Sequence, residues 1–400
     1  MMRVATTRLA AWLLALLLLA APQMAVAGQG DAAPVCTGRD LMAALSEADR
    51  AQIARAVAAT PHATGTRFRA TRDDAVIEIV GTYHFPDPRH APVVAALRPL
   101  IADAGALLVE VGPEGEEQLA RALAEDPSLM VDSDGPTLPE RLPPEQWQAL
   151  GQAMEARGIP AIMVSRMRPW YVATVLGLSP CMIKAARGSD PASGGLDHQL
   201  IAAAEAAGTR VLALEPWDTI FAIFAGLTAE EELDMIRAAL PAAQLADDYA
   251  ATTIEAYFRG DIWAIWEFGR LDALASSGLA AAAVERQLQL AEERLMTARN
   301  RNWIAPLTEA ATDAAQAGRH VVAAFGALHL PGERAVEVPP LFNRIYLIER
   351  QNLVGDGLSD KRDILQLIAN QVFLESMTDV GSRVREYDVN ITSERHEVEG

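Results

Sequence analysis

This chain of 400 residues has few cysteines, few aromatic residues and a shortage of basic side chains. It contains two Cys, and aromatic residues make up 6% of it. Lys and Arg together number 34 against 53 Asp and Glu, which gives a formal net charge of −19. Such a chain repels nucleic acid and anionic lipid head groups, so we expect neither as a partner. Beyond the first 27 residues no run approaches the roughly 18 apolar residues of a membrane-spanning helix, so we expect no stable membrane anchor.

Several common catalytic signatures are also missing. The sequence contains no H-E-x-x-H, no G-x-S-x-G, no P-loop and no G-x-G-x-x-G pattern. These absences argue against the common zincins, α/β-hydrolases, nucleotide hydrolases and dinucleotide-dependent enzymes.

The N-terminus has the three regions of a secretory signal peptide. Arg3 and Arg8 form a basic start, residues 9–21 are apolar, and Ala25-Val26-Ala27 is a small-residue cleavage site. We therefore expect residues 1–27 to be removed and the mature protein to be periplasmic or secreted.

Both cysteines lie after this segment. An even pair in an oxidising compartment predicts a disulfide between Cys36 and Cys181. Two unrelated thiols are the alternative.

Short apolar segments alternate with long helical ones, which predicts an α/β fold. We expect a central, mostly parallel sheet with helices on both faces, more helix than strand, and a large helical insertion at about residues 217–306. The predicted strands are residues 76–80, 106–111, 161–164, 210–214, 321–325 and 344–348. The predicted helices are residues 40–58, 92–103, 114–124, 144–157, 196–207, 229–242 and 280–300, and residues 179–195 are predicted to be a loop. Residues 28–350 then form a single domain, followed at 351–400 by a C-terminal extension that is helical and then polar.

One short pattern occurs twice, each time after a predicted strand. Gly81-Thr82-Tyr83-His84 follows the apolar run at 76–80, and Gly326-Ala327-Leu328-His329 follows the run at 321–325. Glu110 stands at the end of a third strand. Because parallel strands deliver side chains to one carboxyl edge, these three can meet there as metal ligands or as an acid–base set. A His after a strand is also a common structural residue, and spacing alone leaves both readings open.

In this order the motifs resemble the TraB/GumN/Tiki family, whose members carry two G-x-x-H motifs with a Glu between them. Similar segments elsewhere are Cys36 to Leu41, Arg168-Pro169-Trp170, Gly195-Leu196-Asp197, Leu214-Glu215, Arg259-Gly260-Asp261, Arg299-Asn300 and residues 326–332. The resemblance covers about residues 36–350. It departs at Pro216, where the family has Thr, and at Pro339-Pro340 before the last strand.

The resemblance implies a fold like that of the erythromycin esterases and the haem-binding ChaN proteins, and a divalent-metal-dependent, peptidase-like hydrolase. His84, Glu110 and His329 would hold one ion of Zn, Mn, Co or Fe and leave a position open for water. The substrate would be a peptide or a small molecule.

Other side chains are expected to line the same cleft. Glu215 is either the general base or a structural partner of Arg299. Arg299 is expected to orient a ligand carboxylate or stabilise an oxyanion, with Asn300 as a second donor. Asp197 is expected to cap the helix that it opens.

Two other classes of function stay open. One is a haem-, iron- or ligand-binding protein on the same fold, including a peptide-binding scaffold that holds no metal. The other is a metal-independent His/Glu hydrolase of the esterase type.

Overall fold

The computed structural model describes residues 37–188, 194–332 and 344–349. The expected signal peptide, Cys36 and the C-terminal extension lie outside these residues. In the described part of the chain, no helix has both the length and the apolar character needed to span a membrane.

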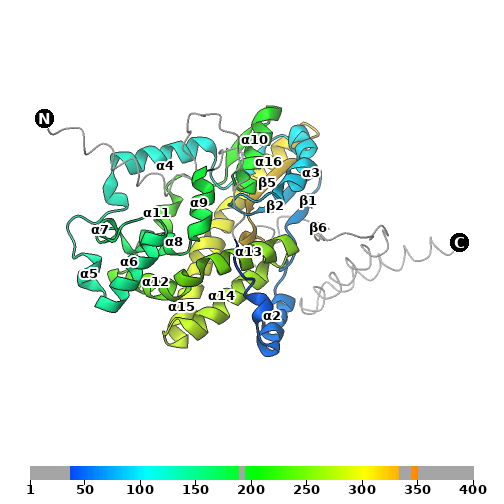
Figure 1. Ribbon diagram of the computed structural model, residues 1–400. Coiled ribbons are helices and arrows are strands. Elements are labelled where there is room, and N and C mark those ends of the chain that lie inside the picture. Colours follow the sequence, from blue (N-terminus) through cyan, green and yellow to red (C-terminus); the bar gives the residue numbers. More distant parts are fainter. Residues whose placement is uncertain (1–36, 189–193, 333–343, 350–400) are drawn as a thin grey trace. The chain divides into compact units, whose positions relative to one another are not determined.

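One mixed sheet of six strands organises the fold, in the order β4-β3-β5-β2-β1-β6. The strands are β1 (Arg67–Arg72), β2 (Ala75–Thr82), β3 (Leu107–Val109), β4 (Val211–Ala213), β5 (Val321–Gly326) and β6 (Arg344–Glu349). Strands β2, β3, β4 and β5 are parallel, whereas β1 is antiparallel to both β2 and β6. The predicted α/β class with a mostly parallel sheet is therefore confirmed (Figure 1).

Helices cover both faces of this sheet. Because successive strand residues point to opposite sides, alternate residues of one strand pack against different helices. On β5, Val321, Ala323 and Phe325 belong to a core shared with one set of helices, whereas Val322 and Ala324 belong to a core shared with another. The first set is α13 (Ala246–Arg259), α14 (Ile262–Ser276) and α16 (Ala298–Gln316), and the second is α3 (His90–Asp103) and α10 (Leu196–Ala207).

A further hydrophobic core lies among helices alone. Its helices are α4 (Pro113–Glu125), α5 (Leu138–Arg141), α6 (Pro144–Ala156), α7 (Ala161–Val164), α8 (Pro169–Leu176), α11 (Thr219–Phe224) and α12 (Ala229–Ala242). Two chain segments build this core, one between β3 and β4 and one after β4. The helices after β4 continue to Gln316, beyond the expected limit of the insertion at 306, because Pro306 lies inside α16.

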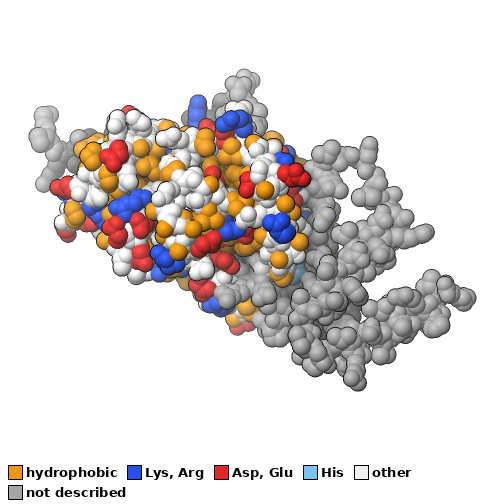
Figure 2. Space-filling view, turned by 90° about the horizontal axis from the view of Figure 1, so that it is seen from below, with side chains coloured by type: hydrophobic (Ala, Val, Ile, Leu, Met, Phe, Trp, Pro, Cys, Tyr) orange, Lys and Arg blue, Asp and Glu red, His pale blue; other side chains and the backbone are white. Residues whose placement is uncertain are grey.

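The remaining described elements are short or peripheral. They are α2 (Glu47–Ala59), α9 (Pro180–Gly188), α15 (Ala281–Glu292), the 3₁₀ turns η1 (Met42–Ala44), η2 (Pro127–Leu129), η4 (Ala243–Leu245) and η6 (Ala327–His329), and the π-helical turn η5 (Glu293–Thr297). Figure 2 shows charged side chains of both signs mixed with apolar ones over the described part of one face, so this face singles out no docking surface.

Helix starts follow local sequence signals. Thr228 precedes α12 and forms a capping box with Glu231: the Glu231 N–H donates to Thr228 Oγ1 at 3.2 Å, and the Thr228 N–H donates to the Glu231 carboxylate at 2.7 Å. Ser46 caps α2 with its side chain alone, because its Oγ accepts from the Asp49 N–H.

Two predictions of local structure are wrong. Residues 161–164 form the single-turn helix α7 rather than a strand, because the carbonyl of Pro160 accepts from the N–H groups of Met163 and Val164. A short apolar run cannot distinguish the two. The expected loop at 179–195 begins instead with α9, where Ser179 Oγ accepts from the Met182 N–H; residues 189–193 lie outside the described residues.

Strand β1 was not predicted. Three of its six residues are Arg, so it lacks the apolar signal of a strand. It pairs with β2 through a hairpin in which Asp73 has a φ of 53°. Arg69 and Glu78 face each other across the pair at 2.7 Å, so the charge that hides the strand also stabilises its pairing.

Candidate functional site

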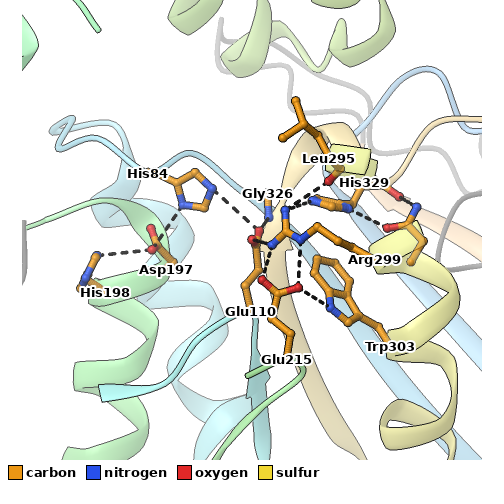
Figure 3. Close-up of polar contacts among 11 residues, drawn as sticks. His84, Glu110, Asp197, His198, Glu215, Leu295, Arg299, Trp303, Gly326 and His329 are labelled. Atoms are coloured by element: carbon orange, nitrogen blue, oxygen red, sulfur yellow. Dashed lines mark hydrogen bonds and ion pairs between the residues drawn. The ribbon is translucent and has the colours of Figure 1, made fainter. Parts of the chain in front are cut away.

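All four parallel strands end beside the same cluster of side chains (Figure 3). His84 follows β2, Glu110 follows β3, Glu215 follows β4, and His329 lies in the turn η6 after β5. Since the strands run parallel, their carboxyl ends share one edge, and residues up to 245 positions apart in sequence meet there.

The three predicted metal ligands, His84, Glu110 and His329, surround the space in front of Gly326. His84 Nε2 lies 3.8 Å from Glu110 Oε1. A Cβ added at Gly326 would lie 3.1 Å from both of these atoms and 3.7 Å from His329 Cδ2. The Gly326 N–H donates to Glu110 Oε1 at 2.6 Å. Glycine therefore keeps open the space between the two imidazoles and the carboxylate, and its backbone holds that carboxylate.

Arg299, from the first turn of α16, joins the other groups. Its Nη2 donates to Glu110 Oε2 at 2.5 Å and to Glu215 Oε1 at 2.7 Å, and its Nε donates to Glu215 Oε2 at 2.9 Å. The Trp303 Nε1–H donates to Glu215 Oε2 at 3.0 Å. Arg299 Nη1 lies 3.2 Å from His329 Nε2. The guanidinium is thus shared by two carboxylates and an imidazole.

Each histidine is held through its Nδ1 atom. His84 Nδ1 lies 3.3 Å from Asp197 Oδ2, and His329 Nδ1 lies 2.6 Å from Asn300 Oδ1. A neutral ring held in this way carries its proton on Nδ1 and a lone pair on Nε2. For His329 the contact with Arg299 requires the same tautomer, because a guanidinium can only donate.

The environment gives the two rings opposite protonation states. Burial lowers the pKa of His329 to about 4, although the charge of Glu110 opposes the shift. Burial also acts against a charge on His84, but Asp197 and Glu110 outweigh it and raise the pKa of His84 to about 9. The His84 side chain keeps 51% of its surface exposed, so water screens this attraction. Near pH 7, His329 is neutral and His84 is protonated.

Glu110 is ionised. Burial alone would raise its pKa, but the two imidazoles and the Arg299 guanidinium lower it to about 2. Because His329 is neutral near pH 7, the positive charge that acts on Glu110 there comes from Arg299 and His84.

The contacts of three predicted site residues bear on the roles expected for them. The amide of Asn300 is engaged by His329, through Oδ1 and through an Nδ2 contact to the His329 carbonyl at 3.3 Å. Glu215 is paired bidentately with Arg299, which is the structural alternative of its two readings. Asp197 does not cap α10, whose N-cap is Gly195, because its carboxylate lies between His84 and His198.

Other members of the site escaped the sequence prediction. Trp303 could have been found, since it stands four residues after Arg299 and therefore on the same helix face. His198 lies 3.2 Å from Glu116, and neither stands at a strand end. The Leu295 carbonyl, in the π-helical turn η5, accepts from Arg299 Nη1 at 3.2 Å.

The donor set fits a divalent ion in its chemistry. Two imidazoles oriented by oxygen acceptors, together with one carboxylate, are common ligands of Zn, Mn, Co and Fe. Within the described residues, however, no three His, Cys, Asp or Glu side chains are already arranged to hold an ion. Arg299 Nη1 faces His329 Nε2, so an ion bound there would have to displace this contact.

The protein is therefore an α/β domain with a mostly parallel sheet, in which two His and one Glu that follow strands meet an Arg from α16. The chain belongs to the TraB/PrgY/gumN family, whose sequence model matches residues 67–337 and so includes every side chain of the cluster. No curated protein and no solved structure gives a significant match.

Proposed function

We propose that this protein is an exported, divalent-metal-dependent hydrolase with peptidase-like activity, acting at the cluster formed by His84, Glu110, Arg299 and His329. The observation that carries the proposal is the orientation of the two imidazoles. Each is held at Nδ1 by an oxygen of a neighbouring side chain. His84 directs its Nε2 toward the space in front of Gly326, and His329 borders that space with its Cδ2 while its Nε2 faces Arg299 Nη1. This arrangement is typical of histidines that bind metal. The export part of the proposal rests on the three regions of the N-terminal segment.

Each side chain of the cluster has its own role in the proposed hydrolysis. A divalent ion held by His84, Glu110 and His329 would polarise a scissile carbonyl and lower the pKa of a bound water. The Gly326 N–H and the nearby cations keep Glu110 ionised. Glu215 and Trp303 fix the guanidinium of Arg299, which can stabilise negative charge on a substrate oxygen.

Elemental analysis of the purified protein tests this function directly, in parallel for wild type, His84→Ala and His329→Ala. His320→Ala is the matched control, because His320 lies at the other end of β5 and contacts the Leu100 carbonyl. We expect about one equivalent of metal in wild type and in the control, and much less in the two site variants. Hydrolysis of a peptide mixture should stop on chelation and return when the metal is restored.

The position of Arg299 favours a second candidate, a metal-independent hydrolase. Here the guanidinium is the resident cation of the site, and His84, which is half exposed beside Glu110, is the acid–base group. This candidate predicts hydrolysis that survives chelation and is lost in His84→Ala. A Soret band in the absorption spectrum of the purified protein would instead favour the haem-binding class.

A further inference from the structure

We propose that Asp197 is a positioning residue for His84 and that His198, tied to Glu116, holds Asp197 in place. His198, Asp197 and His84 form a row that leads to the cluster (Figure 3), and Glu116, in helix α4, contacts His198. The proposal concerns the site of the proposed function, but its first test does not require any hydrolytic activity.

The row alternates acidic and basic groups at short distances. His198 Nε2 lies 3.2 Å from Glu116 Oε1, and His198 Nδ1 lies 3.3 Å from Asp197 Oδ2. The same Asp197 oxygen lies 3.3 Å from His84 Nδ1. One carboxylate oxygen thus serves two imidazoles, which restricts where the carboxylate can sit. The contact with His198 is electrostatic, because its atoms are not aligned for a hydrogen bond.

The backbone adds a second restraint between α10 and His84. The Leu196 N–H donates to the carbonyl of Tyr83 at 2.9 Å, so the start of α10 is bonded to the residue before His84. A Cβ added at Gly195 would lie 2.3 Å from the carbonyl carbon of His84 and 2.5 Å from Asp197 Oδ1. Only glycine permits this close approach, and through it Asp197 comes within reach of the imidazole.

The burial of the row explains why these contacts are specific. The side chains of Asp197, His198 and Glu116 are 19%, 21% and 25% exposed, so water competes weakly for them. Asp197 Oδ1 is buried and has no hydrogen-bond partner among the described residues. Moving the carboxylate would therefore cost the Oδ2 contacts without offering Oδ1 a new one.

The two histidines of the cluster are consequently held by different chemistry. A carboxylate faces Nδ1 of His84, whereas the amide of Asn300 faces Nδ1 of His329. Both acceptors favour the same tautomer, and for His329 the Arg299 guanidinium beside Nε2 favours it as well. The inference predicts that the tautomer of His84 depends on Asp197 and not on Asn300.

Nuclear magnetic resonance of ¹⁵N-labelled imidazoles in the metal-free, full-length protein tests this prediction. The spectra are recorded at a pH where His84 is neutral, and His84→Gln and His329→Gln assign the signals. In wild type we expect the proton on Nδ1 of both rings. In Asp197→Ala the His84 signals should change to those of an Nε2–H tautomer while those of His329 stay unchanged. Asn300→Ala should leave the His84 signals unchanged, and His329 should keep its proton on Nδ1 because Arg299 still donates to its Nε2. Asp197→Asn keeps an oxygen acceptor and should restore the wild-type tautomer.

A Co²⁺ titration gives a second readout. Asp197→Ala should weaken Co²⁺ binding roughly 10–100-fold, the usual effect of losing the partner of a metal-binding histidine. His198→Ala should weaken it less, but more than His320→Ala. An unchanged His84 tautomer in Asp197→Ala overturns the role of Asp197. A His198→Ala variant that matches His320→Ala in both measurements overturns the role of His198. If the tautomers respond as expected but no substrate is cleaved, the positioning role stands and the proposed hydrolase does not.

Discussion

Arg299 Nη1 lies 3.2 Å from His329 Nε2, so a cationic side chain faces the nitrogen that the proposed metal ion would use. An ion and a guanidinium cannot occupy this place together. Arg299 therefore competes with a metal for His329 and also for Glu110, to which its Nη2 donates.

This competition predicts the behaviour of Arg299→Gln. We expect the variant to bind Co²⁺ several-fold more tightly than wild type, because the competing guanidinium is removed. We also expect it to lose hydrolysis, because no guanidinium remains to stabilise negative charge on a substrate oxygen. Without metal it should be destabilised by about 3 kcal/mol, the usual effect of breaking a buried ion pair, since Arg299 is 14% and Glu215 8% exposed. Added metal should restore part of this loss. Calorimetric titration and thermal unfolding measure both effects.

Arg301→Gln is the control for that experiment. Arg301 lies two residues further along α16 and pairs with Glu293 at the surface, where it is 57% exposed. Its loss should change neither stability nor metal affinity measurably. Weaker Co²⁺ binding in Arg299→Gln would show that the guanidinium supports the metal site instead of competing with it.

The lowered pKa of His329 predicts that the protein loses stability in mild acid. This pKa is about 4 in the folded protein and near 6.5 when unfolded, so the unfolded chain takes up the proton first. The contribution of His329 is present above about pH 6.5 and is lost as the pH falls toward 4, by up to about 3 kcal/mol. The free energy of unfolding, measured with denaturant at several pH values in this range, should fall less steeply with decreasing pH in His329→Gln than in wild type. The same pH dependence in both proteins would contradict the low pKa.

The raised pKa of His84 predicts the opposite dependence of stability on pH. The favourable contacts of His84 with Asp197 and Glu110 are complete below about pH 6.5 and are lost as the pH rises toward 9. Because the ring is half exposed, we expect a small effect. Between about pH 6.5 and 9 the free energy of unfolding should fall slightly more in wild type than in His84→Gln. His320→Gln should behave like wild type.

Gly326→Ala separates site geometry from backbone strain. Gly326 has a φ of −50°, which alanine adopts freely, so stability should change little. The added methyl would lie 3.1 Å from Glu110 Oε1 and from His84 Nε2, and it should weaken Co²⁺ binding at least tenfold. In the control Gly112→Ala, the new Cβ meets only Val211 at 3.9 Å. Equal Co²⁺ affinities of the two variants would rule out this space as the binding site.

The Cys36–Cys181 disulfide stays a prediction, because Cys36 lies outside the described residues. The Cys181 N–H donates to Asp247 Oδ1 at 3.3 Å, and a Cβ at Gly38 would lie 2.2 Å from the Asp247 carbonyl oxygen. Cys181 and Gly38 therefore both lie close to Asp247.

Alkylation followed by mass spectrometry tests this bridge. In protein recovered from an oxidising compartment neither cysteine should react before reduction, and both should react afterwards. Reduction should lower stability by up to roughly 4–5 kcal/mol in the chain-entropy model. Labelling of both thiols without reduction would exclude the bridge.

The sequence allowed the strand-end residues to be predicted, because a buried parallel strand followed by Gly and His leaves a simple linear pattern. This pattern identifies His84 and His329, and Glu110 is identified by its place at the end of a third apolar strand. The position of Arg299 depends on the π-helical turn η5 just before it, and such a turn has no sequence signal. Asp197 looked like a helix cap because acidic residues favour helix starts, and only the close approach at Gly195 turns it toward His84.

The order of the strands also determines when the site can form. Strand β5 is the last of the four parallel strands in the chain, yet it lies between β3 and β2 and pairs with both. Until residues 321–326 have been synthesised and inserted, no strand joins β2 to β3, and each keeps an unpaired edge. Closing such distant pairings is a slow step in folding. An incomplete chain therefore has neither a finished sheet nor His329, and the cluster is assembled only in a molecule whose central fold is complete.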